Sequence, residues 1–129
     1  MGSNSLMPHA TVISLPRHVS CHAHIIKELS SKDVPFTWMD AIDGVKSTHS
    51  ELSKNATTDL GQWFMTPGMI GCFLSHQRCW EQCIKTNQPL IVFEDDVIVL
   101  ADNFCEVVTA TMRTLKNADA YTKCKCERK

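Results

Sequence analysis

The strongest constraint on the fold is a continuous apolar run that ends in three carboxylates. Leu90-Ile-Val-Phe93 is followed directly by Glu94-Asp95-Asp96. An apolar run of this kind is typical of a central strand that helices cover on both faces. Unpaired charges are very costly to bury, so the three acids must face solvent, a cation or basic partners. The run therefore predicts a buried strand whose carboxyl end opens onto an acidic edge.

The rest of the chain supplies the other elements of an α/β fold. β-Branched and aromatic runs predict strands at 10–15 and 36–39, and helical periodicity predicts helices at 18–32, at 66–86 and from 102 onward. In the first helix the expected apolar face is Val19, Ala23, Ile26 and Leu29. Residues 45–65 are polar without a clean period, which favours a loop with at most one helical turn. Strands that alternate with helices predict a mainly parallel sheet with flanking helices.

The helix termini have their own signals. Thr66-Pro67 is a typical helix start, a capping hydroxyl followed by proline at the first helical position. Asp102 is the expected cap of the last helix, in which apolar residues from Phe104 to Leu115 share one face. From Asn117 the sequence is polar, so we expect the helix to end there and the tail to be frayed.

Polar side chains follow each of the three predicted strands. Arg17 follows the first strand, the turn Asp43-Gly44 follows the second, and Glu94-Asp95-Asp96 follow the third. Ligands of parallel sheets bind at the carboxyl ends of the strands, so one crevice is expected to collect these residues. Because side chains alternate along a strand, Glu94 and Asp96 should share one side and Asp95 the other. Such carboxylates suit a hard divalent cation, and a solvated strand end is the alternative.

Composition narrows the function classes. Hydrophobic residues make up 43% of the 129 residues, charged residues 21%, and the formal net charge is −1. These values are typical of a globular domain and disfavour broad binding to nucleic acid or to an anionic membrane. The most apolar stretch, 90–101, contains three carboxylates, so no membrane span is expected. The N-terminus lacks a secretory pattern, which predicts a cytoplasmic protein, or one of the secretory lumen if the sequence is incomplete.

Four of the cysteine and histidine residues follow one face of the helix predicted at 66–86: Cys72, His76, Cys79 and Cys83. This stripe spans about 16 Å at the rise of an α-helix. Zinc ligands must converge within about 2.0–2.3 Å of the ion, so one straight helix can supply only two of them. The cysteines are therefore expected to be small core residues in a reducing compartment. Three other histidines are expected on the surface of the first helix: His18, His22 and His24.

Four segments of the sequence resemble glycosyltransferase family 25, which includes lipopolysaccharide β-galactosyltransferases and procollagen galactosyltransferases. In chain order they are Val12–Arg17, Asp40–Gly44, Pro67–His76 and Leu90–Val97. The chain departs from the family at Ser14, where Asn is common, and at Met69, where Glu is frequent. The resemblance implies a GT-A-like, Rossmann-like α/β fold, a UDP-sugar donor, expected to be UDP-galactose, and a divalent metal, Mn²⁺ or Mg²⁺.

The resemblance also implies functional residues. Glu94-Asp95-Asp96 match the DXD-like motif of the family, with Asp96 and Glu94 as the expected metal ligands. The residues expected to bind the donor are Arg17, Asp43, Gly44, Ser75, His76, Glu94 and Asp95. Arg17 would neutralise a phosphate, and His76 would hydrogen-bond the sugar or a phosphate. A nucleophilic Ser75–His76 pair is not expected, because adjacent helix positions point in different directions.

The expected function is metal-dependent transfer of a sugar to a hydroxyl of a glycan or hydroxylated-protein acceptor, as in glycan or lipopolysaccharide biosynthesis. Family catalytic domains continue beyond the acidic motif, whereas 129 − 96 = 33 residues follow it here. We therefore expect a truncated chain with a disordered N-terminus (1–9), a donor-binding half (10–116) and a polar tail (117–129). No catalytic residue is assigned.

Two other functions compete with this one. The first is a catalytically inactive glycosyltransferase fragment or nucleotide-binding remnant, which would keep the acidic motif without the catalytic half. The second is a phosphoreceiver-type signalling domain, whose first strand also ends in an acidic pair. The sequence disfavours it, because the acidic pair comes late and no later apolar strand carries the required aspartate or lysine.

Overall fold

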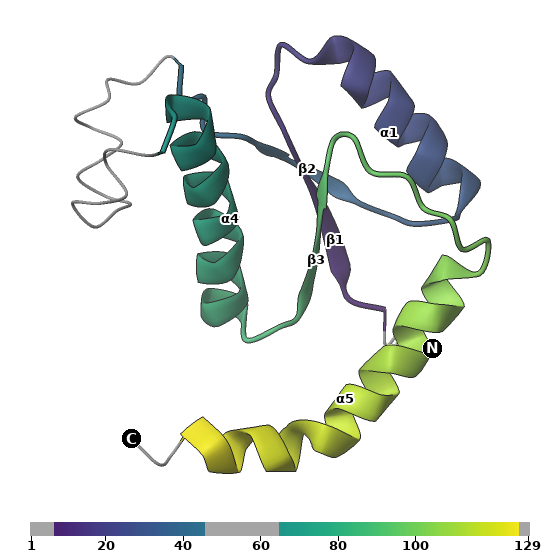
Figure 1. Ribbon diagram of the computed structural model, residues 1–129. Coiled ribbons are helices and arrows are strands. Elements are labelled where there is room, and N and C mark those ends of the chain that lie inside the picture. Colours follow the sequence, from purple (N-terminus) through teal and green to yellow (C-terminus); the bar gives the residue numbers. More distant parts are fainter. Residues whose placement is uncertain (1–6, 46–64, 127–129) are drawn as a thin grey trace.

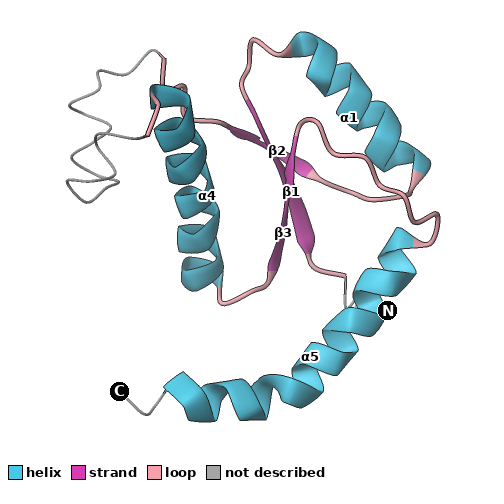
Figure 2. Cartoon of the chain, viewed as in Figure 1, coloured by secondary structure: helices cyan, strands magenta, loops and turns pink. Residues whose placement is uncertain are grey.

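The computed structural model describes residues 7–45 and 65–126, with side chains described up to residue 116. In chain order the elements are β1 (His9–Ser14), α1 (Val19–Ser31), β2 (Thr37–Asp40), α4 (Pro67–Thr86), β3 (Leu90–Glu94) and α5 (Phe104–Cys126). The three strands form one parallel sheet in the order β2-β1-β3, flanked by helices (Figures 1 and 2). This architecture confirms the predicted α/β fold with a parallel sheet. The loop expected at 45–65 lies almost wholly outside the described residues.

In the sheet that the described residues form, the central strand is β1, and the expectation that 90–93 would be central is wrong for this sheet. Every residue of β1 after His9 is buried. In β3 Phe93 is buried, while the three apolar residues before it are half-buried. The physical reason is that β3 has a hydrogen-bonded neighbour on one side only in the described sheet. Within this sheet the apolar run of β3 packs against helices, as the contact of Phe93 with Phe104 shows.

One face of the sheet packs on α1 and on the start of α5. Ile25 and Leu29 of α1 are fully buried against Val12 of β1 and Phe93 of β3. The ring of Phe93 lies 5.8 Å from that of Phe104 at the start of α5, measured between centroids. Figure 1 shows α1 on one side of the sheet and α4 on the other.

The apolar face expected for α1 is partly wrong. Leu29 is buried as expected, but Val19 and Ile26 are 70% and 51% exposed, and Ile25 is the residue that turns inward. Adjacent helix positions point about 100° apart, so only one of Ile25 and Ile26 can face the sheet. The buried face therefore contains Ile25 and Leu29, one turn apart. The periodicity of the sequence alone had selected Ile26 in place of Ile25.

Helix α4 begins as its sequence predicts. The side chain of Thr66 accepts a hydrogen bond from the backbone N–H of Met69 at 3.2 Å, and Pro67 is the first helical residue. The helix ends at Thr86, and Asn87 follows in the left-handed conformation with φ of 51°. Asparagine tolerates this conformation better than most residues, so it stops the helix before the turn into β3.

Helix α5 differs from the prediction at both ends. It begins at Phe104, so Asn103 precedes it, and Asp102 instead pairs with Lys32 at the end of α1. The hydrogen bond and charge of Lys32 lower the pKa of Asp102. The helix continues to Cys126, so the segment from Asn117 that we expected to fray is helical. No helix in the described part of the chain is long and apolar enough to cross a membrane.

Candidate functional site

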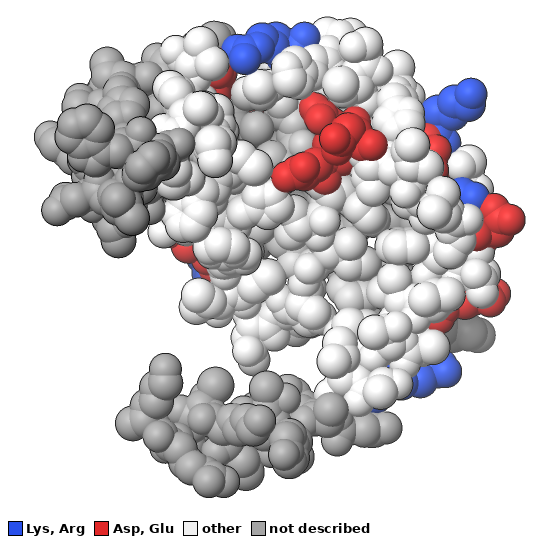
Figure 3. All heavy atoms as spheres, viewed as in Figure 1, with Lys and Arg blue, Asp and Glu red and all other residues white. Residues whose placement is uncertain are grey.

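A cleft of about 260 Å³ lies at the carboxyl ends of the three strands. Its lining includes seven of the residues singled out in the sequence: Arg17, Asp43, Gly44, Ser75, Glu94, Asp95 and Asp96. The expectation that one crevice collects the polar strand ends is confirmed. His76 is not part of the lining but contacts it through Glu94. Figure 3 shows acidic side chains gathered where the chain leaves β3.

Glu94 points toward α4. Its Oε1 lies 3.1 Å from Nε2 of His76 and accepts a hydrogen bond from the thiol of Cys72 at 3.6 Å. Cys72 and His76 are four residues apart on α4, so both project from the same face of the helix toward the end of β3. Desolvation of the sulfur, then the charge and hydrogen bond of Glu94, raise the pKa of the Cys72 thiol. The thiol therefore stays protonated and donates to the carboxylate.

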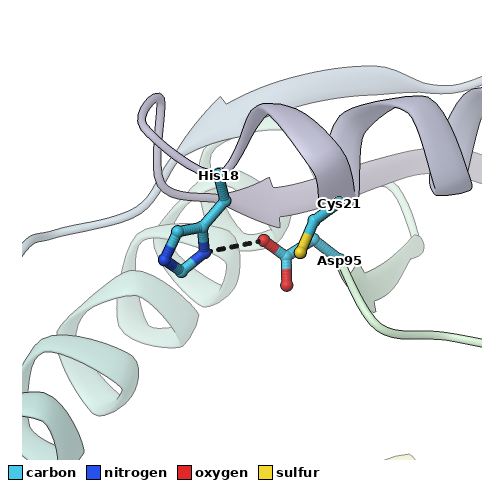
Figure 4. Close-up of side chains that lie close together, drawn as sticks. All are labelled: His18, Cys21 and Asp95. Atoms are coloured by element: carbon cyan, nitrogen blue, oxygen red, sulfur yellow. Dashed lines mark hydrogen bonds and ion pairs between the residues drawn. The ribbon is translucent and has the colours of Figure 1, made fainter.

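Asp95 points to the other side, toward α1. Its Oδ2 accepts a hydrogen bond from the Ser14 hydroxyl at 2.6 Å and lies 3.3 Å from Nδ1 of His18. Figure 4 shows His18 and Cys21, from the start of α1, converging on this carboxylate. His22 Nε2 lies 3.0 Å from the Ser14 oxygen and extends the network. The predicted alternation of Glu94 and Asp95 is confirmed.

Asp96 is the third carboxylate of the motif, exposed and on the wall of the cleft. Within the described residues it makes no hydrogen bond or ion pair with another side chain. Glu94 uses only Oε1 in its contacts with α4, so Oε2 is not engaged by them. Asp96 and Glu94 therefore both keep carboxylate oxygens that the described side-chain contacts do not engage.

Arg17 and Asp43 meet at the entrance formed by the ends of β1 and β2. Nη1 of Arg17 forms an ion pair with Oδ2 of Asp43. The other oxygen of Asp43 accepts a hydrogen bond from the backbone N–H of Val45 at 3.2 Å, which closes the predicted turn at Asp43-Gly44. The Arg17 side chain is 48% exposed, so part of its planar fork of donors remains open to solvent.

The first turns of α4 pack directly on the backbone that follows β2. A Cβ at Gly71 would lie 2.6 Å from the carbonyl oxygen of Ile42, and one at Gly44 would overlap the carbonyl of Pro67. The buried Ser75 hydroxyl accepts from Ile42 N–H at 2.9 Å and donates to the Gly71 carbonyl at 2.7 Å. Gly44, Gly71 and Ser75 thus hold this wall of the cleft in place.

Several residues of the site were missed or placed elsewhere by the sequence. The first-helix histidines were expected on the surface, but His18 and His22 contact the Ser14–Asp95 pair, and the exposed His24 bonds the Val97 carbonyl at 2.9 Å. The cysteine stripe is not uniformly core: Cys79 is buried, while Cys72 is exposed and contacts Glu94. His18 and His22 lie on the same face of α1 as the buried Ile25 and Leu29. The sequence alone does not select Ile25 over Ile26, so it gave no signal that this face turns toward the site.

The parallel sheet and its flanking helices form an α/β unit that is consistent with a portion of a GT-A-like, Rossmann-like fold. The family model described as glycosyltransferase family 25 (LPS biosynthesis protein) matches residues 7–129. The chain therefore belongs to glycosyltransferase family 25.

Similar proteins come from bacteria and animals. The chain is 36% identical over 89 residues to the lipooligosaccharide biosynthesis protein lic2B of Haemophilus influenzae, covering 68% of this chain and 33% of that protein. It is 30% identical over 89 residues to the lacto-N-neotetraose biosynthesis glycosyltransferase LgtE of Neisseria gonorrhoeae, covering 68% and 32%. It is 33% identical over 102 residues to the inactive glycosyltransferase 25 family member 3 of Mus musculus, covering 72% and 17%. The matched region thus spans at most 33% of these relatives.

Proposed function

We propose that this chain forms the donor-binding part of a glycosyltransferase that takes a sugar from a UDP-sugar, expected to be UDP-galactose. The observation that carries the proposal is the cleft, in which three consecutive carboxylates and Arg17 meet at the carboxyl ends of parallel strands. Parallel α/β sheets bind their ligands at this edge. Family membership supports the reaction class.

The residues of the cleft fit a hard divalent cation. Mn²⁺ and Mg²⁺ prefer oxygen ligands and accept one or two carboxylates together with substrate phosphates and waters. Asp96 and Oε2 of Glu94 would hold the cation, while Asp95 is engaged by Ser14 and His18. A bound cation of this kind supplies charge neutralisation for the diphosphate that leaves with UDP.

The remaining residues divide into binding and support. Arg17 would place its unpaired donors on a phosphate, in competition with its ion pair to Asp43. His76 orients Glu94 through the 3.1 Å contact with Oε1. Ser75 and Gly44 hold the wall of the cleft through backbone contacts, so we assign them a positioning role in donor binding. The acceptor we propose is a hydroxyl of a glycan or of a hydroxylated protein.

The test is calorimetric titration of UDP and UDP-galactose into the chain, with and without Mn²⁺. We expect binding that requires the metal and that weakens by about tenfold or more in Asp96→Ala, a loss of about 1.4 kcal/mol or more. Asp102→Ala is the matched control, because Asp102 is an exposed carboxylate outside the cleft. Binding that needs no metal, or that Asp96→Ala leaves unchanged, contradicts the proposal.

A second candidate is a catalytically inactive member of the family that binds the donor without turning it over. The observation that favours it is the similarity to the mouse family member named as inactive. Assays of UDP-galactose hydrolysis and of transfer to hydroxyl acceptors separate the two candidates. Metal-dependent UDP binding without either activity supports the inactive candidate, and transfer rejects it.

A further inference from the structure

A group of potential metal ligands of another chemistry lies beside the acidic cleft, on the face of Glu94 that looks toward α4. Three potential ligand atoms converge there: the sulfur of Cys72, a ring nitrogen of His76 and a carboxylate oxygen of Glu94. Two come from one turn of α4 and the third from the end of β3. A single helix can supply only two converging ligands, and the strand supplies the third.

The spacing of these atoms matches a tetrahedral ion. Ligand atoms at about 2.0 Å (nitrogen or oxygen) and 2.3 Å (sulfur) from zinc lie about 3.3 to 3.5 Å from one another. In the structure Glu94 Oε1 lies 3.1 Å from His76 Nε2 and 3.6 Å from Cys72 Sγ. All three atoms lie within 4.8 Å of one another. Two of the three ligand–ligand distances are thus within about 0.2 Å of those of a tetrahedral shell.

We propose that Cys72, His76 and Glu94 form a site for a borderline-soft divalent cation of the zinc class, with a fourth position left open. Thiolate and imidazole ligands favour Zn²⁺ over Mg²⁺ or Mn²⁺, which prefer carboxylates and waters. Cys72 and Glu94 both line the cleft, so a cation can reach the site from solvent. The site differs in chemistry from the oxygen ligands of Asp96 and Glu94 Oε2.

A second group of three, His18, Cys21 and Asp95, lies on the opposite face of the motif (Figure 4). It is a weaker candidate, because the same Asp95 oxygen that faces His18 already accepts the Ser14 hydroxyl at 2.6 Å. The two groups each contain one cysteine, so substitution of that cysteine distinguishes them.

Occupancy of the Cys72 site has a consequence for the donor site. The two sites share the Glu94 carboxylate, and two divalent ions on one carboxylate repel each other. Zn²⁺ is therefore expected to weaken Mn²⁺-dependent UDP binding. This consequence rests on the proposed function, whereas the zinc-class site itself does not.

Co²⁺ is the probe for the site, since it adopts zinc geometries and its thiolate charge-transfer absorption reports a cysteine–metal bond. We expect the full chain to develop this absorption on titration with Co²⁺ and to lose it when Zn²⁺ is added. Cys72→Ser should abolish the absorption, and His76→Asn should weaken Co²⁺ binding by at least about tenfold. Cys83→Ser is the matched control on the same helix and should leave both the thiolate absorption and the Co²⁺ affinity unchanged.

The outcomes separate the possibilities. No thiolate absorption in the unmodified chain, or absorption that survives Cys72→Ser, overturns the proposal. Loss of the absorption in Cys21→Ser but not in Cys72→Ser also overturns it and assigns the metal to the His18 group. The titration contains no nucleotide, so its result is independent of UDP binding. Far-ultraviolet circular dichroism of each variant confirms that the fold is retained.

Discussion

Glu94 and Asp95 each contact two side chains of the candidate site, on opposite sides of the acidic motif. Oε1 of Glu94 accepts from Cys72 and lies against His76, while Oε2 remains for the cleft. Asp95 is tied to Ser14 and His18, and Asp96 is exposed. Three adjacent residues of similar chemistry therefore have three different surroundings, because successive side chains at a strand end point to different sides.

The chemistry of Cys72 provides a test of this arrangement. Desolvation raises the pKa of the Cys72 thiol most, and the Glu94 carboxylate raises that pKa further because its charge disfavours the thiolate and it accepts the thiol proton in a hydrogen bond. Glu94→Gln removes the charge, so the pKa should fall and more thiolate should be present at mildly alkaline pH. We expect Cys72 to react faster with iodoacetamide in Glu94→Gln, measured by mass spectrometry of the α4 peptide.

Two controls accompany this measurement. Cys83 lies on the same helix without a contact to Glu94, so its rate should not change. Asp102→Asn removes a carboxylate elsewhere and should leave Cys72 unaffected. An equal rate for Cys72 in the unmodified chain and in Glu94→Gln would show that desolvation alone governs the thiol.

At the scale of elements, local signals predicted the helix α4 and the strands well. Thr66-Pro67 starts the helix and Asn87 follows its end. Both signals depend on the backbone preferences of a few neighbouring residues, so they can be recognised from a short stretch of sequence. The phase of α1 was not predictable in the same way. Ile25 and Ile26 are equally apolar, and only contact with β1 and β3 decides which one is buried. The same choice of face carries His18 and His22 into the site.

The close approach of α4 to the backbone after β2 predicts an unusual effect of a helix glycine. At an open helix position, a Gly→Ala substitution stabilises by about 1 kcal/mol through helix propensity. In Gly71→Ala, however, the added Cβ would lie 2.6 Å from the Ile42 carbonyl oxygen. We expect the overlap to dominate and to lower the free energy of unfolding by about 1–3 kcal/mol. Urea denaturation followed by circular dichroism measures this change.

Gly68→Ala is the matched control in the first turn of the same helix. The nearest atom to its added Cβ is Thr66 Oγ1 at 3.9 Å, so the space is open. Here the propensity gain should remain, with stabilisation of up to about 1 kcal/mol. If both alanine substitutions stabilise the chain, α4 does not approach the backbone of residues 42–44 as closely as described.

At the scale of the whole molecule, β1 joins the two sides of the fold. Ala10 and Val12 contribute to the core beneath α1, and Ser14 at the carboxyl end of the same strand holds Asp95. The sequence predicted the α/β class and the shared cleft, because polar residues followed each predicted strand. It could not predict that β1 is central, since strand order depends on contacts between segments far apart in the chain. The core and the cleft are therefore expected to unfold together.

Leu29→Ala tests this coupling. Leu29 is fully buried beneath the sheet on the α1 side, and its truncation should lower the free energy of unfolding by about 2–5 kcal/mol. Ile26→Ala, at a 51% exposed position on the same helix, should change it by about 0.5 kcal/mol or less.

Because β1 is buried on both faces, Leu29→Ala should accelerate hydrogen exchange of the most protected amides in α4 as much as in α1, although α4 packs on the opposite face. Faster exchange confined to α1 would show that the two sides open independently, and that the cleft wall formed by α4 remains folded when the core beneath α1 is weakened.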